Sequence, residues 1–108
     1  MRTAEEYVEA LYKMKPNIYL GDEIVGRDDW RIQGGINIVK ETYKCAFDPK
    51  YEDLCTAISH YTGKKINRFT HIHQNKEDLL KKQRMTRVLS HKVGGCIQRC
   101  MGIDALNA

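Results

Sequence analysis

Three helix-breaking points divide this chain of 108 residues into segments. They are Pro16, the pair Asp48-Pro49 and the pair Gly94-Gly95. Between these points, apolar residues recur at intervals of three and four, which is the period of an amphipathic α-helix. A chain of this length builds one modest domain around one core. We therefore predict a single, mostly α-helical domain over residues 1–108.

The first segment predicts a helix followed by a small hairpin. Thr3 and Glu6 have the spacing of a capping box, and the apolar period after them predicts a helix to about Met14. Pro16 ends this helix. Residues 17–25 consist of two short extended pieces on either side of a Gly-Asp pair, which predicts a short β-hairpin.

The middle of the chain predicts two further helices. A second apolar stripe, which ends before Asp48-Pro49, predicts the first of them and consists of Ile36, Val39, Tyr43, Ala46 and Phe47. Pro49, followed by acidic residues, predicts a new helix start, and we expect this helix to run to Ile58. Residues 63–74 are mixed in character and are predicted to be irregular.

A long helical segment near the end of the chain carries two cysteines one turn apart. Asn75 predicts its N-cap, with Asp78 in the first turn. Gly94-Gly95 either splits the segment into two helices or lets another backbone approach closely. Cys96 and Cys100 project from one face, which suits two thiolates that bind two irons of one cluster. The same spacing suits two small residues in a helix interface, and spacing by itself favours packing.

Charge and hydropathy limit the compartment and the partners. The formal net charge of +4 is only mildly basic. No apolar run in the sequence reaches membrane-spanning length. Glu5, Glu6 and Glu9 lie where a signal peptide has an uncharged apolar core. We therefore expect a cytoplasmic protein with reduced thiols, and neither a membrane nor a nucleic acid as its partner.

The other cysteines and two of the histidines are weaker metal candidates. Cys45, Cys55, His71 and His73 lack the close paired spacing of a zinc site. We expect the two cysteines to pack in the core and the two histidines to be partly exposed loop residues. Trp30, the only tryptophan, is also expected to pack.

Basic residues are concentrated between Lys81 and Arg87, with Lys92 and Arg99 beyond. A solvated helix face, whose lysine stems cover apolar neighbours, explains this run. Phosphate binding by one or two of these residues is the alternative. Aromatic residues are not interleaved with the run, which argues against a platform for single-stranded nucleic acid.

Several segments together carry a family resemblance. The most specific is Cys96-Ile-Gln-Arg-Cys-Met-Gly-Ile-Asp-Ala-Leu-Asn-Ala108. The others are Thr3-Ala-Glu-Glu-Tyr7, Asp48-Pro-Lys-Tyr-Glu-Asp-Leu54, Gly63-Lys-Lys-Ile-Asn-Arg-Phe69, His73-Gln74, Asp78-Leu79 and Lys81-Lys82. On these segments the chain resembles the N-terminal part of the 4-hydroxybutyryl-CoA dehydratase branch of the 4-hydroxyphenylacetate 3-hydroxylase superfamily. The flavin monooxygenases of that superfamily are not expected to carry the two cysteines.

The resemblance implies a fold and a set of cofactors. Family members fold like acyl-CoA dehydrogenases, with an N-terminal helical domain, a central β-domain and a C-terminal four-helix bundle, and they form tetramers that bind FAD between subunits. Cys96 and Cys100 would be two ligands of a four-iron, four-sulfur (4Fe–4S) cluster whose other ligands lie downstream of Ala108. Gln98 would lie near the active site, and Arg87 would bind the substrate. No FAD-binding residue is expected within these 108 residues.

The resemblance also implies a reaction. The family removes water from 4-hydroxybutyryl-CoA, a CoA thioester, to give crotonyl-CoA, and isomerises vinylacetyl-CoA. The flavin would oxidise the substrate transiently by one electron, and the cluster would act as a Lewis acid on the leaving hydroxyl. We expect the chain to be the N-terminal fragment of a larger three-domain enzyme, a lyase and isomerase that is inactive without the missing domains or a companion subunit.

Two alternatives remain open. The first is the N-terminal part of a flavin-dependent 4-hydroxyphenylacetate 3-monooxygenase-like enzyme, in which the cysteines are structural. The second is a stand-alone helical interaction module whose basic helix binds an acidic partner or RNA.

Overall fold

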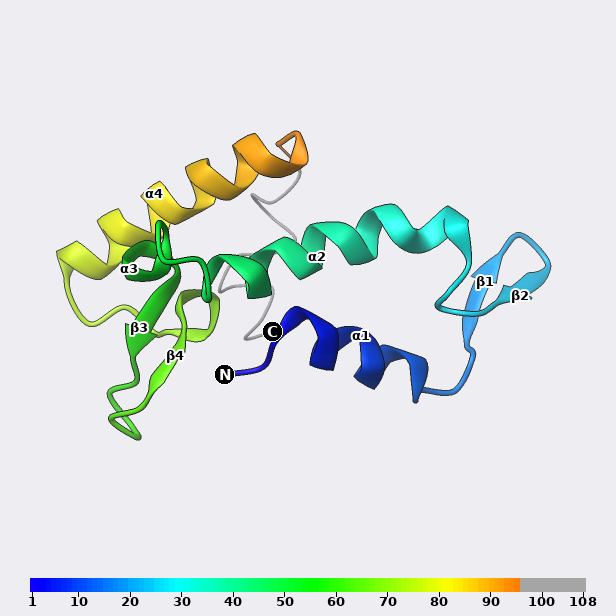
Figure 1. Ribbon diagram of the computed structural model, residues 1–108, viewed down its shortest axis with the longest axis horizontal. Helices are drawn as coiled ribbons and strands as arrows, with labels where there is room; N and C mark the ends of the chain where they lie inside the picture. Colours follow the sequence, from blue (N-terminus) through cyan, green and yellow to red (C-terminus); the bar gives the residue numbers. More distant parts are fainter. Residues whose placement is uncertain (96–108) are drawn as a thin grey trace.

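The computed structural model describes residues 1–95 as a mostly helical arrangement with two small antiparallel sheets. The elements in chain order are α1 (Ala4–Tyr12), β1 (Ile18–Leu20), β2 (Glu23–Val25), the 3-10 helix η1 (Trp30–Ile32), α2 (Gln33–Cys45), α3 (Glu52–Cys55), β3 (Thr56–Ile58), β4 (Lys65–Asn67), the 3-10 helix η2 (Arg68–Thr70) and α4 (Lys76–Val93). Helices α1 and α2 run side by side, the β1–β2 hairpin lies at one end, and α3, β3, β4 and α4 lie around the other end of α2 (Figure 1). The mostly α-helical prediction is therefore confirmed.

The first helix and the first hairpin form where the sequence predicts them. The backbone N–H of Thr3 donates to the Glu6 carboxylate at 2.9 Å, and the backbone N–H of Glu6 donates to the Thr3 hydroxyl at 3.2 Å, which completes the capping box. Helix α1 ends at Tyr12, two residues before the expected Met14. Strands β1 and β2 form the hairpin expected over residues 17–25.

Helix α2 is the central element of the described chain. It contacts both α1 and α4, and Tyr7 of α1 stacks on Tyr43 of α2 with ring centroids 5.0 Å apart. The main core cluster lies where the end of α2 meets α3, η2 and α4, and its members are Cys45, Ala46, Cys55, Phe69, Met85 and Leu89. The packing predicted for Cys45 and Cys55 is confirmed, because both are fully buried.

The third helix is much shorter than the sequence predicts. We expected it to begin at Pro49 and to reach Ile58, but α3 covers only Glu52–Cys55, and the chain then turns into strand β3. β-Branched Thr56 and Ile58 favour an extended backbone, and β3 pairs with β4. Residues 63–74 are accordingly not irregular throughout, because they contain β4 and η2.

The long helix α4 begins and ends at its sequence signals. The Asn75 side chain accepts a hydrogen bond from the backbone N–H of Asp78 at 2.9 Å, as an N-cap does. Gly94 has a φ of 78° and ends the helix after Val93, because the left-handed conformation strongly favours glycine. Within the described part of the chain, no helix has the length and apolar character needed to cross a membrane.

The environment of Trp30 differs from the prediction. Its side chain is 81% exposed at the start of η1. The single tryptophan therefore does not pack against any part of the chain that the structure describes, and the expectation that it packs is wrong for residues 1–95.

Candidate functional site

The residues that the sequence nominates fall into two groups. Arg87 lies on α4 with an exposed side chain, and within residues 1–95 this side chain makes no hydrogen bond or ion pair. Cys96, Gln98 and Cys100 lie outside the described residues. The structure therefore places one predicted site residue and leaves Gln98 and the two cysteines as predictions.

The polar network at the start of α4 is centred on Arg68, which is only 4% exposed. Its Nε donates to the backbone carbonyl of Leu54 at 2.6 Å, and its Nη2 donates to the carbonyl of Thr56 at 2.6 Å. Carbonyls at the end of a helix lack partners within the helix, and α3 ends at Cys55. The guanidinium of Arg68 therefore caps the end of α3 and also binds the first residue of β3.

Asp78 joins this guanidinium to helix α4. Its Oδ1 lies 3.5 Å from Nη1 of Arg68, and its Oδ2 lies 3.0 Å from Nε2 of His71. The same Oδ2 accepts the backbone N–H of Gln74 at 2.9 Å. The hydrogen bond from Gln74 is the main reason why the pKa of Asp78 lies below its ordinary value, with further lowering from His71 and Arg68. The carboxylate thus stays ionised within its three partners.

His71 is buried, which corrects the expectation of a partly exposed loop histidine. Only 4% of its surface is accessible, because η2 turns the chain so that the ring faces the first turn of α4. His73 is half-buried, and burial, followed by the nearby charge of Lys82, lowers its pKa. Within the described residues, Nη1 of Arg68, Nδ1 of His71 and Nε2 of His73 are buried without a hydrogen-bond partner. These atoms make the network the least satisfied polar region of residues 1–95.

A cavity of about 410 Å³ lies at the base of the β1–β2 hairpin, and one of about 400 Å³ lies beside the buried network. Ion pairs border the second cavity: Lys65 pairs with Glu52, and Lys81 lies 3.2 Å from Asp53. Because its lysines already face carboxylates, this cavity has no unbalanced positive charge from them. The ion pair of Lys81 with Asp53 is consistent with the expectation that the basic run between Lys81 and Arg87 is a solvated helix face.

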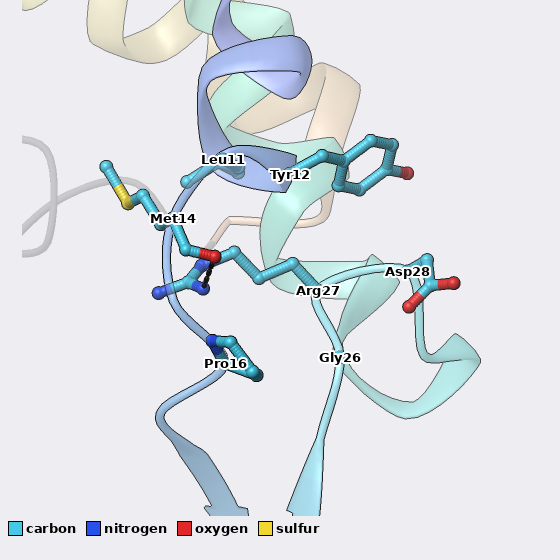
Figure 2. Close-up of a pocket in the computed structure, with 7 residues that line it drawn as sticks. All are labelled: Leu11, Tyr12, Met14, Pro16, Gly26, Arg27 and Asp28. Carbon is cyan, nitrogen blue, oxygen red and sulfur yellow. Dashed lines mark hydrogen bonds between the residues drawn. The ribbon is translucent and has the colours of Figure 1, made fainter.

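The first cavity is formed between the end of α1 and the hairpin (Figure 2). Arg27 extends across it and donates to the carbonyl of Lys15 at 2.8 Å and to the side-chain oxygen of Asn17 at 2.8 Å. The remaining lining is largely apolar and includes Leu11, Tyr12, Met14 and Pro16. Arg27 therefore fixes the hairpin relative to α1.

No group of three or more metal-ligating side chains occurs among residues 1–95. Cys45 and Cys55 are fully buried in the core, and the hydrogen bond with Cys55 and burial raise the pKa of the Cys45 thiol. A protonated, buried thiol is a poor metal ligand.

The Arg68–Asp78–His71 network positions the start of α4, the helix that carries Arg87 and precedes Cys96 in the sequence.

Sequence reasoning missed Arg68 as a site residue and misjudged His71. Arg68 follows a strand too short to recognise, so its burial depends on the unpredicted β3–β4 pairing. The signal that was available is local: Asn67 caps η2 by accepting from the backbone N–H of Phe69 at 3.1 Å. An Asn at that position marks a turn, but it does not reveal which neighbouring side chain is buried.

Comparison with known proteins agrees with this architecture. Residues 3–108 match the family described as 4-hydroxyphenylacetate 3-hydroxylase N terminal. A relative from Clostridium aminobutyricum, named 4-hydroxybutyryl-CoA dehydratase/vinylacetyl-CoA-Delta-isomerase, is 44% identical over 112 residues, which cover 100% of this chain and 22% of the relative. A solved structure described as an oxygen-tolerant archaeal 4-hydroxybutyryl-CoA dehydratase from N. maritimus is 41% identical, with a TM-score of 0.86 over 98% of this chain and 21% of that chain. The chain thus spans about a fifth of the length of these relatives.

Proposed function

Because the chain belongs to the family of 4-hydroxyphenylacetate 3-hydroxylase N-terminal domains, we propose that it is the N-terminal helical domain of a 4-hydroxybutyryl-CoA dehydratase. The observation that carries this proposal is the 44% identity to the Clostridium aminobutyricum relative across 100% of the chain. In the complete, three-domain enzyme, the activity is the dehydration of 4-hydroxybutyryl-CoA to crotonyl-CoA and the isomerisation of vinylacetyl-CoA. The domain alone is inactive in this proposal.

The donor chemistry of the last segment supports a role in holding a 4Fe–4S cluster. Cys96 and Cys100 offer two thiolates at a spacing of one helical turn, and thiolates are the ligands that such clusters take. The other two thiols of the chain do not fit, because both are fully buried in the core. When bound, the cluster supplies a Lewis acid for the leaving hydroxyl. The remaining ligands and the FAD site belong to the rest of the complete enzyme, which we expect to be a tetramer.

Two polar residues of this chain complete the proposed site. Arg87 binds and orients the CoA thioester substrate through its fixed positive charge. Its side chain is exposed and forms no hydrogen bond or ion pair within the described residues, which supports this role. Gln98 lies between the two cysteines in sequence and hydrogen-bonds to the substrate or to the surroundings of the cluster. Arg68, Asp78 and His71 are positioning residues that fix the first turn of the helix carrying Arg87.

The alternatives have less support. A 4-hydroxyphenylacetate 3-monooxygenase-like enzyme shares the family, but the curated relative and the solved relative are both named as dehydratases. A nucleic-acid-binding module needs unpaired basic groups. Lys81 pairs with Asp53, and Lys92 lies 3.9 Å from Asp48 and covers the ring of Tyr51, so two of these basic groups already have partners in this chain.

The experiment uses a chimaera in which this chain replaces the corresponding segment of the Clostridium aminobutyricum relative. The chimaera is reconstituted anaerobically with iron and sulfide, and the variants Cys96→Ser and Cys100→Ser are compared with Cys45→Ala, which removes a core thiol. Iron content, electron paramagnetic resonance and crotonyl-CoA formation are measured. We expect the serine variants to lose the cluster and the activity, and the Cys45→Ala variant to keep both.

A folded chimaera whose cysteine-to-serine variants keep the full cluster signal would contradict the proposal. The two cysteines would then be packing residues. A folded chimaera that forms no cluster even with both cysteines in place would favour the flavin hydroxylase branch of the family.

A further inference from the structure

The outer face of the β1–β2 hairpin is an apolar surface that the described chain leaves uncovered. Tyr19 and Ile24 are directly opposite each other in the antiparallel register, so their side chains lie on the same face. They are 65% and 54% exposed. A β-branched residue beside an aromatic residue is a pair that normally packs against a neighbour.

The inner face of the same hairpin is already used. Val25 is 3% exposed, and its register partner Ile18 is half-buried, so this side packs against the rest of the chain. An isolated hairpin of two strands is marginally stable in water. Arg27 holds the hairpin in place through the carbonyl of Lys15 and the side chain of Asn17, so its outer face is presented on a fixed support.

Further exposed apolar side chains lie close to the hairpin in the sequence. Of the eleven large apolar side chains that are exposed within residues 1–95, five lie between residues 12 and 30. They are Tyr12, Met14, Tyr19, Ile24 and Trp30, and we call them the hairpin patch. Tyr12 and Met14 line the cavity of about 410 Å³ at the base of the hairpin, where Figure 2 shows their side chains spread on either side.

Arg31, next to Trp30 in the sequence, is paired with two carboxylates within the chain. Arg31 lies 3.2 Å from the Glu23 carboxylate and 2.8 Å from the Asp29 carboxylate. These hydrogen bonds with Arg31 lower the pKa of Asp29 to about 2. An interface core is depleted of charged residues and enriched in Trp, Tyr and Met, which is the composition of the patch. The partner is therefore expected to present an apolar protein surface to the patch.

We propose that the hairpin patch docks on the part of the complete enzyme that lies outside this chain, within the same polypeptide. This inference rests on the proposed function, since relatives are about five times as long as this chain. The hairpin lies at one end of α2, opposite the α3 and β3–β4 end (Figure 1). A covalently connected partner has a high effective concentration, so it occupies an apolar patch before a second copy does. The patch then anchors the N-terminal domain while α4 contributes Arg87.

The test is hydroxyl-radical labelling of the full-length chimaera, with native and urea-unfolded samples compared by peptide mass spectrometry. If the patch stayed as exposed as it is in the described chain, Tyr19 and Trp30 would oxidise nearly as fast in both samples. We expect native oxidation of both residues to be slower than in urea by about fivefold or more, because a docked side chain is almost fully covered. Equal oxidation rates in the two samples would overturn the proposal.

Two further measurements sharpen the test. The double substitution Tyr19→Thr with Ile24→Thr keeps residues that favour a strand, and we expect it to lower the thermal midpoint of the chimaera. The matched control is Ile58→Thr on β3, which is 62% exposed and lies outside the patch. An equal loss from both variants contradicts docking at the patch. Protection that disappears on dilution to the monomer would assign the surface to a second copy and overturn the proposal.

These readouts require neither cluster nor activity. Protected labelling in a chimaera without a cluster would leave docking supported and the dehydratase assignment contradicted. A normal cluster together with unprotected Tyr19 and Trp30 would leave the dehydratase assignment supported and docking at the patch contradicted.

Discussion

Nε2 of His71 lies 3.0 Å from Oδ2 of Asp78, which places a buried histidine from the end of η2 against the first turn of α4. The contact links two elements whose sequence separation is only seven residues. Arg68 reaches the same carboxylate from the other side and also binds the end of α3. The start of α4 is therefore fixed by three polar groups rather than by apolar packing alone.

Replacing Arg68 with methionine should lower the stability of this domain strongly. The change removes the donors to the carbonyls of Leu54 and Thr56 and leaves Asp78 without its buried cation. We expect the free energy of unfolding to fall by about 2–4 kcal/mol. Urea denaturation followed by circular dichroism measures the change.

The matched control for that substitution is Arg84→Met on α4. The side chain of Arg84 is exposed and forms no hydrogen bond or ion pair with other residues in the described range. Its replacement should change stability by no more than about 0.5 kcal/mol. Equal effects of the two substitutions would mean that the buried guanidinium contributes nothing specific.

Asp78 should make part of the stability depend on pH. Its pKa is lowered from 3.8 by the Gln74 backbone hydrogen bond and then by His71 and Arg68, so the unfolded chain binds its proton more tightly. The stabilisation is therefore complete above the ordinary pKa and is lost as the pH falls through the lowered one. The difference in unfolding free energy between the wild type and Asp78→Asn should be constant above about pH 5 and should shrink as the pH falls from about 4 through the lowered pKa. A difference that stays constant as the pH falls through the lowered pKa would contradict the assignment.

Elements with local signals were predictable from the sequence. The Thr3 capping box and the Asn75 cap each act within one helical turn, so α1 begins and ends close to the expected residues and α4 begins where expected. The end of α4 at Gly94 is one of the two alternatives that the pair Gly94-Gly95 left open. The hairpin over residues 17–25 was also predictable, because its turn and strands are adjacent. These features are set by neighbouring residues alone.

Elements that depend on distant contacts were not predictable in the same way. Strand β3 has three residues and is stable only because it pairs with β4, so the acidic start after Pro49 suggested a longer helix. The burial of Arg68 and His71 follows from that pairing and from the position of α4. The prediction that Trp30 packs was wrong for a different reason. An apolar side chain indicates burial, yet no described residue covers Trp30.

The core thiols should resist labelling in the folded domain. Cys45 and Cys55 are fully buried, so neither thiol is accessible to a reagent in the folded domain. The hydrogen bond between them and burial raise the pKa of Cys45, whereas the same hydrogen bond lowers the pKa of Cys55, so Cys55 is protected by burial alone. In a variant with Cys96→Ser and Cys100→Ser, we expect no thiol to react with a maleimide until the domain is unfolded. Labelling followed by intact mass measures this, and urea-unfolded protein provides the positive control. Rapid native labelling of either thiol would show that the core around α2 and α3 opens.

Gly94→Ala should destabilise the end of α4. Gly94 has a φ of 78°, where an L-residue with a Cβ is strained, although among residues 1–95 no other atom outside its chain neighbours lies within 4 Å of the added carbon. The loss should therefore be purely conformational, about 1 kcal/mol, and it should be measurable by thermal unfolding. Gly34→Ala is the control, because Gly34 lies inside α2 with open space at its Cβ, and alanine should stabilise that helix. Equal effects at the two positions would contradict a role for the left-handed cap.

Arg87→Ala should reduce the activity of the full-length chimaera without changing its folding. The side chain is exposed on α4 and contacts no other described residue through a hydrogen bond or ion pair, so its removal leaves the domain intact. Losing a charged hydrogen bond to the CoA thioester should lower kcat/KM by about 10- to 100-fold. Arg84→Ala, on the same helix, is expected to leave kcat/KM and the thermal midpoint unchanged, since Arg84 has no proposed contact with substrate. Full activity of Arg87→Ala with normal cluster content would separate Arg87 from substrate binding, and an equal loss from both variants would indicate a general effect of positive charge on α4.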